Sequence, residues 1–135
     1  MPIVCEAARH LSMVGFPSAR PLVMDPKRTF LERAAAIHVA CRKGSWGNGE
    51  DDRHSRHWYD LDRLASAGVA EAAMGDRDLA IEVAQQKEDF WRKPSINYAQ
   101  ALSGDLQLVP TGIGRAALEA DYPAMTLQGC CAARL

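Results

Sequence analysis

Alanine-rich segments with a helical spacing of apolar residues constrain the fold of this chain more than any other sequence feature. Alanine clusters at 34–40, 65–84 and 116–120, and it favours helix more than any other residue does. β-branched residues are sparse and seldom alternate with polar ones, so few segments suit a β-strand. The sequence therefore predicts a mainly α fold, a bundle of about four helices with at most one or two short extended segments.

Start and stop signals set the limits of the predicted helices. Asp25-Pro26 and a capping box of Thr29 and Glu32 are alternative starts for the first helix. Proline fits poorly inside a helix, so Pro123 is expected to end or kink the last one. The four predicted helices run from 25 or 29 to 43, from 55 to 67, from 76 to 91 and from 111 to 122.

The remaining segments divide the chain into three parts. Residues 1–22 form a poorly patterned N-terminal segment, 23–125 the helical part, and 126–135 a loose tail. Inside the helical part, 69–74 is expected to make one short turn. Residues 94–110 are expected to be irregular, and the alternation of Leu106 and Leu108 favours a short extended piece within them.

Charge and length exclude several classes of protein. The 135 residues carry a net charge of −1, so no overall basic field attracts the chain to nucleic acid. No apolar run reaches the roughly 18 residues of a membrane span, and Glu6, Arg9 and His10 interrupt the apolar region that a secretory signal at the N-terminus would need. A cytoplasmic location with reduced cysteines is therefore expected.

Arg56, Asp60 and Arg63 recur at helical spacing and fall on one helix face. A carboxylate flanked by guanidinium groups stays ionised and can help to orient a ligand that carries phosphate. The alternative is a solvated surface ion pair, which the spacing alone favours. Cys41, His54 and His57 match no standard zinc spacing, so no metal site is predicted within this chain.

A Gly-Ser pair followed by Asp-x-Asp would indicate nucleotide transfer, because two such carboxylates can share divalent metal ions. The chain contains Gly44-Ser45, Asp60-Leu-Asp62 and Asp76-Arg-Asp78. Residues two apart on a helix point in nearly opposite directions, so neither aspartate pair can hold one metal pair. We therefore reject both pairs as that motif.

Several motifs nevertheless resemble one family in the correct order. The segment from Asp25 to His38 contains Arg-Thr-Phe-Leu-Glu-Arg and resembles the Arg-Thr-Phe-Trp-Glu-Lys…His segment of AbiEii-type nucleotidyltransferase-like toxins. Ser55-Arg-His-Trp-Tyr-Asp-Leu61 is similar to the family's Arg-His-Tyr-Tyr-Asp-Leu motif. Lys87 with Phe90-Trp91, Leu106-Gln-Leu-Val-Pro110, and Leu118-x-x-Asp-Tyr122 with Met125 also match. The resemblance spans roughly 23–125.

The resemblance implies roles for five residues. Asp60 matches the motif's aspartate and is the expected catalytic residue, a contact to metal, nucleotide or acceptor. Arg33, Arg56 and His57 are the expected nucleotide-binding residues, and Glu32 supports them. Arg33 stands where the family has lysine, which changes the reach and geometry of the cation.

The resemblance also implies a reaction and its partners. Family members use an NTP and Mg²⁺ to transfer a nucleotide, with tRNA as the acceptor in some, in type IV toxin–antitoxin and abortive-infection systems. The Gly-Ser…Asp-x-Asp half is missing here, so we expect a truncated C-terminal portion that is inactive alone. One alternative is a non-catalytic module that binds the cognate antitoxin or a separate N-terminal half, through the face that the missing domain would cover. Another alternative is a tRNA-contacting helical domain, with Arg53, Arg56, Arg63, Arg92 and Lys93 along one basic face.

Overall fold

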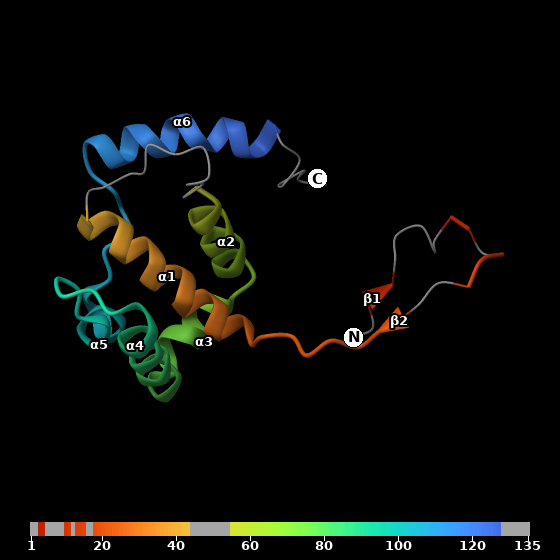
Figure 1. Cartoon of the computed structure of the whole chain (residues 1–135), viewed down its shortest axis with the longest axis horizontal. Coiled ribbons are helices and arrows are strands. Elements are labelled where there is room, and N and C mark those ends of the chain that lie inside the picture. The colour runs from red at the N-terminus through yellow and green to blue at the C-terminus, as the bar shows by residue number, and fades with distance from the viewer. Residues whose placement is uncertain (1–2, 5–9, 12, 16–17, 44–54, 128–135) are drawn as a thin grey trace.

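The computed structural model describes residues 3–4, 10–11, 13–15, 18–43 and 55–127. Most of these residues lie in helices (Figure 1). Two short strands, β1 (Ile3–Val4) and β2 (Ser18–Ala19), pair antiparallel near the N-terminus. The helices are α1 (Pro26–Lys43), α2 (Ser55–Ser66), α3 (Val69–Gly75), α4 (Arg77–Trp91), α5 (Tyr98–Gln100), the π-helical turn η2 (Ala101–Asp105) and α6 (Ile113–Leu127). The predicted mainly α class is confirmed, with two more α-helices than the expected four.

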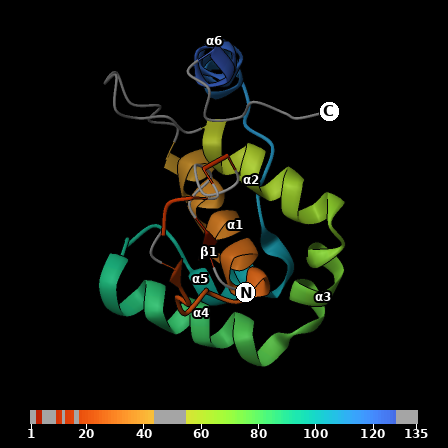
Figure 2. The same cartoon turned by 90° about the vertical axis from the view of Figure 1, so that its right-hand side faces the viewer.

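Helix α1 is the central element, and α2, α3, α4 and η2 all contact it (Figures 1 and 2). Its apolar residues recur every three or four positions, so Phe30, Ala34 and Ile37 lie on one buried face. Leu61 of α2, Ala73 of α3 and Val83 of α4 complete the core against this face. No helix within the described residues is long and apolar enough to cross a membrane.

The starts of two helices follow the predicted capping signals. Helix α1 begins at Pro26, and the Asp25 carboxylate accepts the Lys27 N–H at 2.9 Å, so the first of the two alternative starts is correct. Asp76 caps α4 by accepting the Leu79 N–H at 3.1 Å. Residues 44–54, which connect the first two predicted helices, and most of the tail lie outside the described residues.

One prediction for the second half of the chain was wrong. Residues 98–105 are helical rather than irregular, and the Asn97 side chain caps them by accepting the Gln100 N–H at 3.0 Å. Of the two effects predicted for Pro123, an end of the helix or a kink, the structure excludes the end, since α6 continues through Pro123 to Leu127.

The segment 106–108 is neither helix nor strand, with Leu106 in an extended backbone conformation, and it ties two helices together. Gln107 donates its backbone N–H to Nδ1 of His38 on α1 at 3.0 Å. The Leu108 carbonyl accepts the indole N–H of Trp58 on α2 at 2.8 Å. The Leu106–Pro110 motif therefore serves to hold α1 and α2 in place.

The contact between His38 and Gln107 makes stability depend on pH. Burial lowers the pKa of His38, and the nearby Arg42 cation lowers it further, while Asp105 opposes them. As pH falls, His38 therefore binds a proton in the unfolded chain, near the ordinary pKa of about 6.5, before it does so in the folded chain. The stability supplied by neutral His38 is present above that pH and is lost as pH falls through the lower folded-state pKa.

We therefore expect the urea concentration at the unfolding midpoint to decrease as pH is lowered from about 7.5 to about 5.5. This range extends about one unit either side of the ordinary pKa of histidine. His38→Asn keeps an acceptor near the Nδ1 position but cannot titrate. Its midpoint is expected to change less over the same range. An equal decline in both proteins would show that other groups carry the pH dependence.

Candidate functional site

One guanidinium joins the two motif segments that the family resemblance singled out. Arg33 Nε on α1 lies 3.3 Å from Asp60 Oδ2 on α2. Arg33 Nη1 lies 2.9 Å from His57 Nδ1, one turn earlier on α2. His57 and Asp60 are three residues apart on a helix, so both face α1. We call Arg33, His57 and Asp60 the α1–α2 polar cluster.

The cluster fixes the roles of its nitrogen atoms. A guanidinium only donates hydrogen bonds, so His57 Nδ1 accepts in this contact and the proton of the neutral ring is on Nε2. The side chains of Arg33 and Asp60 are about one-third exposed, at 36% and 33%. Solvent therefore reaches the cluster, and a ligand that approaches from that side can contact it.

The structure places the other two predicted site residues outside this contact. The Glu32 carboxylate lies next to Arg33 in sequence but pairs with Arg28 Nε at 3.2 Å. Arg28 continues to Glu82 on α4 at 3.0 Å, so Glu32 belongs to a network that joins α1 to α4. Arg56 is exposed on α2. The ion pair of Asp60 comes from Arg33 on another helix, which residue spacing within α2 did not indicate.

The structure places both Asp-x-Asp pairs on helices. Asp60 and Asp62 lie within α2, with Asp60 half-buried and Asp62 exposed. Asp76 and Asp78 occupy the cap and first turn of α4. No group of three or more His, Cys, Asp or Glu side chains within the described ranges can hold a metal ion.

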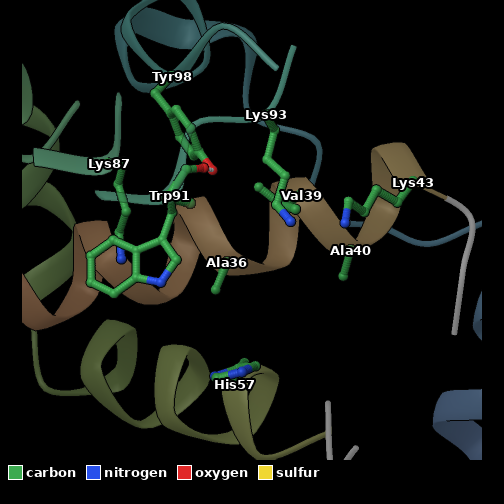
Figure 3. A pocket seen from close by; sticks show the side chains of 10 residues that line it. Ala36, Val39, Ala40, Lys43, His57, Lys87, Trp91, Lys93 and Tyr98 are labelled. Carbon is green, nitrogen blue, oxygen red and sulfur yellow. Dashed lines mark hydrogen bonds between the residues drawn. The ribbon is translucent and has the colours of Figure 1, made fainter. Parts of the chain in front are cut away.

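A basic pocket adjoins the α1–α2 polar cluster, and His57 lines it (Figure 3). The cavity of about 370 Å³ lies beside α1 and receives side chains from α2 and α4. Sequence reasoning noted Lys87 and Trp91 as family-like residues and Lys93 as a basic residue that could contact tRNA, but it did not bring Lys43 and Lys93 together in one pocket. The only signal for Lys43 was its place in the last turn of α1, where a basic residue is common in any helix.

The last family-like motif has a structural role. Asp121 of α6 accepts the backbone N–H of Ser55 at 3.0 Å and also binds the Ser55 hydroxyl. The Ser55 hydroxyl lies 3.6 Å from the sulfur of Met125. Ser55 is the first residue of α2, so Asp121 from α6 satisfies an N–H at that helix start. The motif therefore attaches α6 to α2.

Comparison with known proteins gives one family. No curated protein and no solved structure matches the chain significantly. The family model described as nucleotidyl transferase AbiEii toxin, type IV TA system, matches residues 2–128, a longer stretch than the 23–125 that contains the motifs. The chain therefore belongs to the AbiEii family of nucleotidyltransferase toxins from type IV toxin–antitoxin systems.

Proposed function

We propose that the α1–α2 polar cluster is the part of an AbiEii toxin that contacts the nucleotide. Asp60 is the catalytic residue, and Arg33 and His57 bind the nucleotide with help from Arg56. Glu32 supports the site indirectly, because its ion pair with Arg28, which also binds Glu82, holds α1 against α4. The observation that carries the proposal is the single Arg33 guanidinium, which contacts both His57 and Asp60 from the opposite helix.

The chemistry of the cluster suits a phosphate ligand. Arg33 has five N–H donors, and its contacts with Asp60 and His57 leave others for phosphate oxygens. Asp60 keeps the guanidinium in place and holds an anionic oxygen near the ligand. The guanidinium of arginine is planar and has parallel N–H donors, whereas the ammonium of the family lysine acts as a point charge. Arg33 can therefore bind two oxygens of one phosphate in a bidentate manner.

The reaction of the family is nucleotide transfer from an NTP, and enzymes of this class generally depend on metal ions. We propose that the acceptor is a tRNA and that the reaction takes place in the cytoplasm. We further propose that residues 1–135 alone do not turn over. The helical placement of both Asp-x-Asp pairs supports this proposal, because neither pair can grip two metal ions.

Two assays test the proposal separately. The purified chain with labelled NTPs, Mg²⁺ and tRNA is expected to give no labelled RNA, and transfer that Asp60→Ala abolishes would contradict its inactivity. Arg33→Gln is expected to weaken NTP binding roughly tenfold, since a hydrogen bond to a charged group contributes about 1.5–3 kcal/mol. Arg42→Gln removes an exposed arginine from the same helix as the control. Equal affinities in the two variants would contradict the role of Arg33.

The alternative function is a non-catalytic module that binds its cognate antitoxin or a separate N-terminal half. An exposed apolar run ahead of α1 favours it: Leu22 is fully exposed, Val23 is 79% exposed and Met24 is 51% exposed. Contiguous exposed apolar side chains mark interaction surfaces. Co-purification with the product of a neighbouring gene, lost on replacing Leu22 and Val23 by serine, would support this function. A monomer without a partner would count against it.

A further inference from the structure

The pocket beside the α1–α2 polar cluster combines an apolar wall with several cations (Figure 3). Ala36, Val39 and Ala40 of α1 supply the apolar wall. The indole of Trp91 also lines the pocket. The Lys87 ammonium lies 4.5 Å from the centre of the indole ring. The basic side chains that line the pocket are Lys43, His57, Lys87 and Lys93.

Two of these lysines lie close enough to repel each other. The neighbouring Lys93 ammonium lowers the pKa of Lys43, first through a hydrogen-bond contact and then through charge repulsion. Figure 3 shows both side chains on the same side of α1, by Val39 and Ala40. No carboxylate is among the described residues that line the pocket. A bound anion would relieve this repulsion, whereas the described residues that line the pocket leave it in place.

Helix dipoles do not account for this charge. Lys43 ends α1 and Lys93 follows the end of α4, where the partial negative charge of a helix end favours cations, whereas Lys87 lies before the last turn of α4. Each helix end offers only about half a negative charge, so the two ends together offset roughly one of the three ammonium charges. The described residues that line the pocket therefore keep a net positive charge, which matches an anion with several charges.

We propose that this pocket binds a condensed phosphate, with adjacent phosphoryl groups between Lys43 and Lys93 and a further charge at Lys87. A free polyphosphate and the tail of a nucleoside triphosphate share this chemistry, and Trp91 can distinguish them by contact with a base. The site does not depend on nucleotide transfer, since its lysines lie outside the α1–α2 polar cluster. The concave shape and the net charge of −1 favour this small anion over an RNA backbone, which needs an extended basic surface.

Titration calorimetry of the full chain with inorganic triphosphate tests the proposal. The Lys43→Gln/Lys93→Gln double variant is expected to bind at least about tenfold more weakly, because two charge-assisted contacts are lost. Arg92→Gln is the matched control, since Arg92 is exposed beside Lys93 but does not line the pocket. It is expected to bind as the unchanged protein does. Far-ultraviolet circular dichroism checks that each variant is folded.

Further ligands and variants make each outcome decisive. Tighter binding of ATP than of triphosphate, with the difference lost in Trp91→Ala, would support the proposal and assign the ligand as a nucleotide. Equal binding of the two would support it and assign a free polyphosphate. Equal weakening by Arg92→Gln and the lysine variants, or lysine-dependent binding of RNA without triphosphate binding, would overturn it. Arg33→Gln should leave the part of triphosphate binding that depends on Lys43 and Lys93 intact, so failure of the α1–α2 polar cluster as a nucleotide site is distinguishable from failure of the pocket.

Discussion

Replacing Ile37 by alanine is expected to lower the free energy of unfolding by about 3 kcal/mol, within the range of large-to-small core substitutions. Ile37 has no exposed surface and packs in the core between α1, α2, α3 and α4. The substitution removes its buried carbon atoms and leaves a cavity that packed helices fill only in part. Urea unfolding monitored by circular dichroism measures the loss.

The matched control keeps the shape of the side chain. Ile37→Val removes one methylene and is expected to cost about 1 kcal/mol. A cost for Ile37→Ala as small as that of the valine variant would show that α1 is not the centre of the core. Because Ala36 of the basic pocket is the next residue on α1, a loosened α1 should also weaken triphosphate binding in the alanine variant.

Local signals predicted the long helices because those signals lie within each helix. The spacing of Phe30, Ala34 and Ile37 identified the buried face of α1, and Asp76 identified the start of α4. The helical turn at 98–105 was missed because its stability depends on Tyr98, which is buried against other elements. Its hydroxyl donates to the Trp91 carbonyl at 3.1 Å, a contact that no local pattern reveals.

The sequence indicated the residues of the α1–α2 polar cluster but not the contacts between them. The resemblance identified both Arg33 and Asp60, but helical spacing suggested Arg56 and Arg63 as the partners of the carboxylate. Periodicity relates residues within one helix, whereas the Arg33–Asp60 pair joins two helices that meet only in the folded chain. The same reason hid the pocket, since Lys43 and Lys93 come from the ends of different segments.

Asp121→Ala is expected to detach α6 from α2 and to lower the free energy of unfolding by about 2 kcal/mol, as hydrogen bonds to charged groups do. Ser55 is 1% exposed, so the substitution leaves its backbone N–H and hydroxyl buried without their acceptor. The cost of an unsatisfied buried donor adds to the lost attraction. Thermal unfolding and amide hydrogen exchange of the first turn of α2 measure the effect.

Two variants on α6 separate docking from the general effect of removing a carboxylate. Asp121→Asn keeps an oxygen acceptor for Ser55 without the charge, so its cost should lie between those of the unchanged protein and the alanine variant. Glu119→Ala removes a carboxylate that pairs with Arg115 on the exposed face, and it should change stability by less than about 0.5 kcal/mol. If Glu119→Ala is as costly as Asp121→Ala, the attachment of α6 does not depend on Ser55. If only Asp121→Ala increases exchange at the start of α2, then the last family-like motif acts by holding the helix that carries His57 and Asp60.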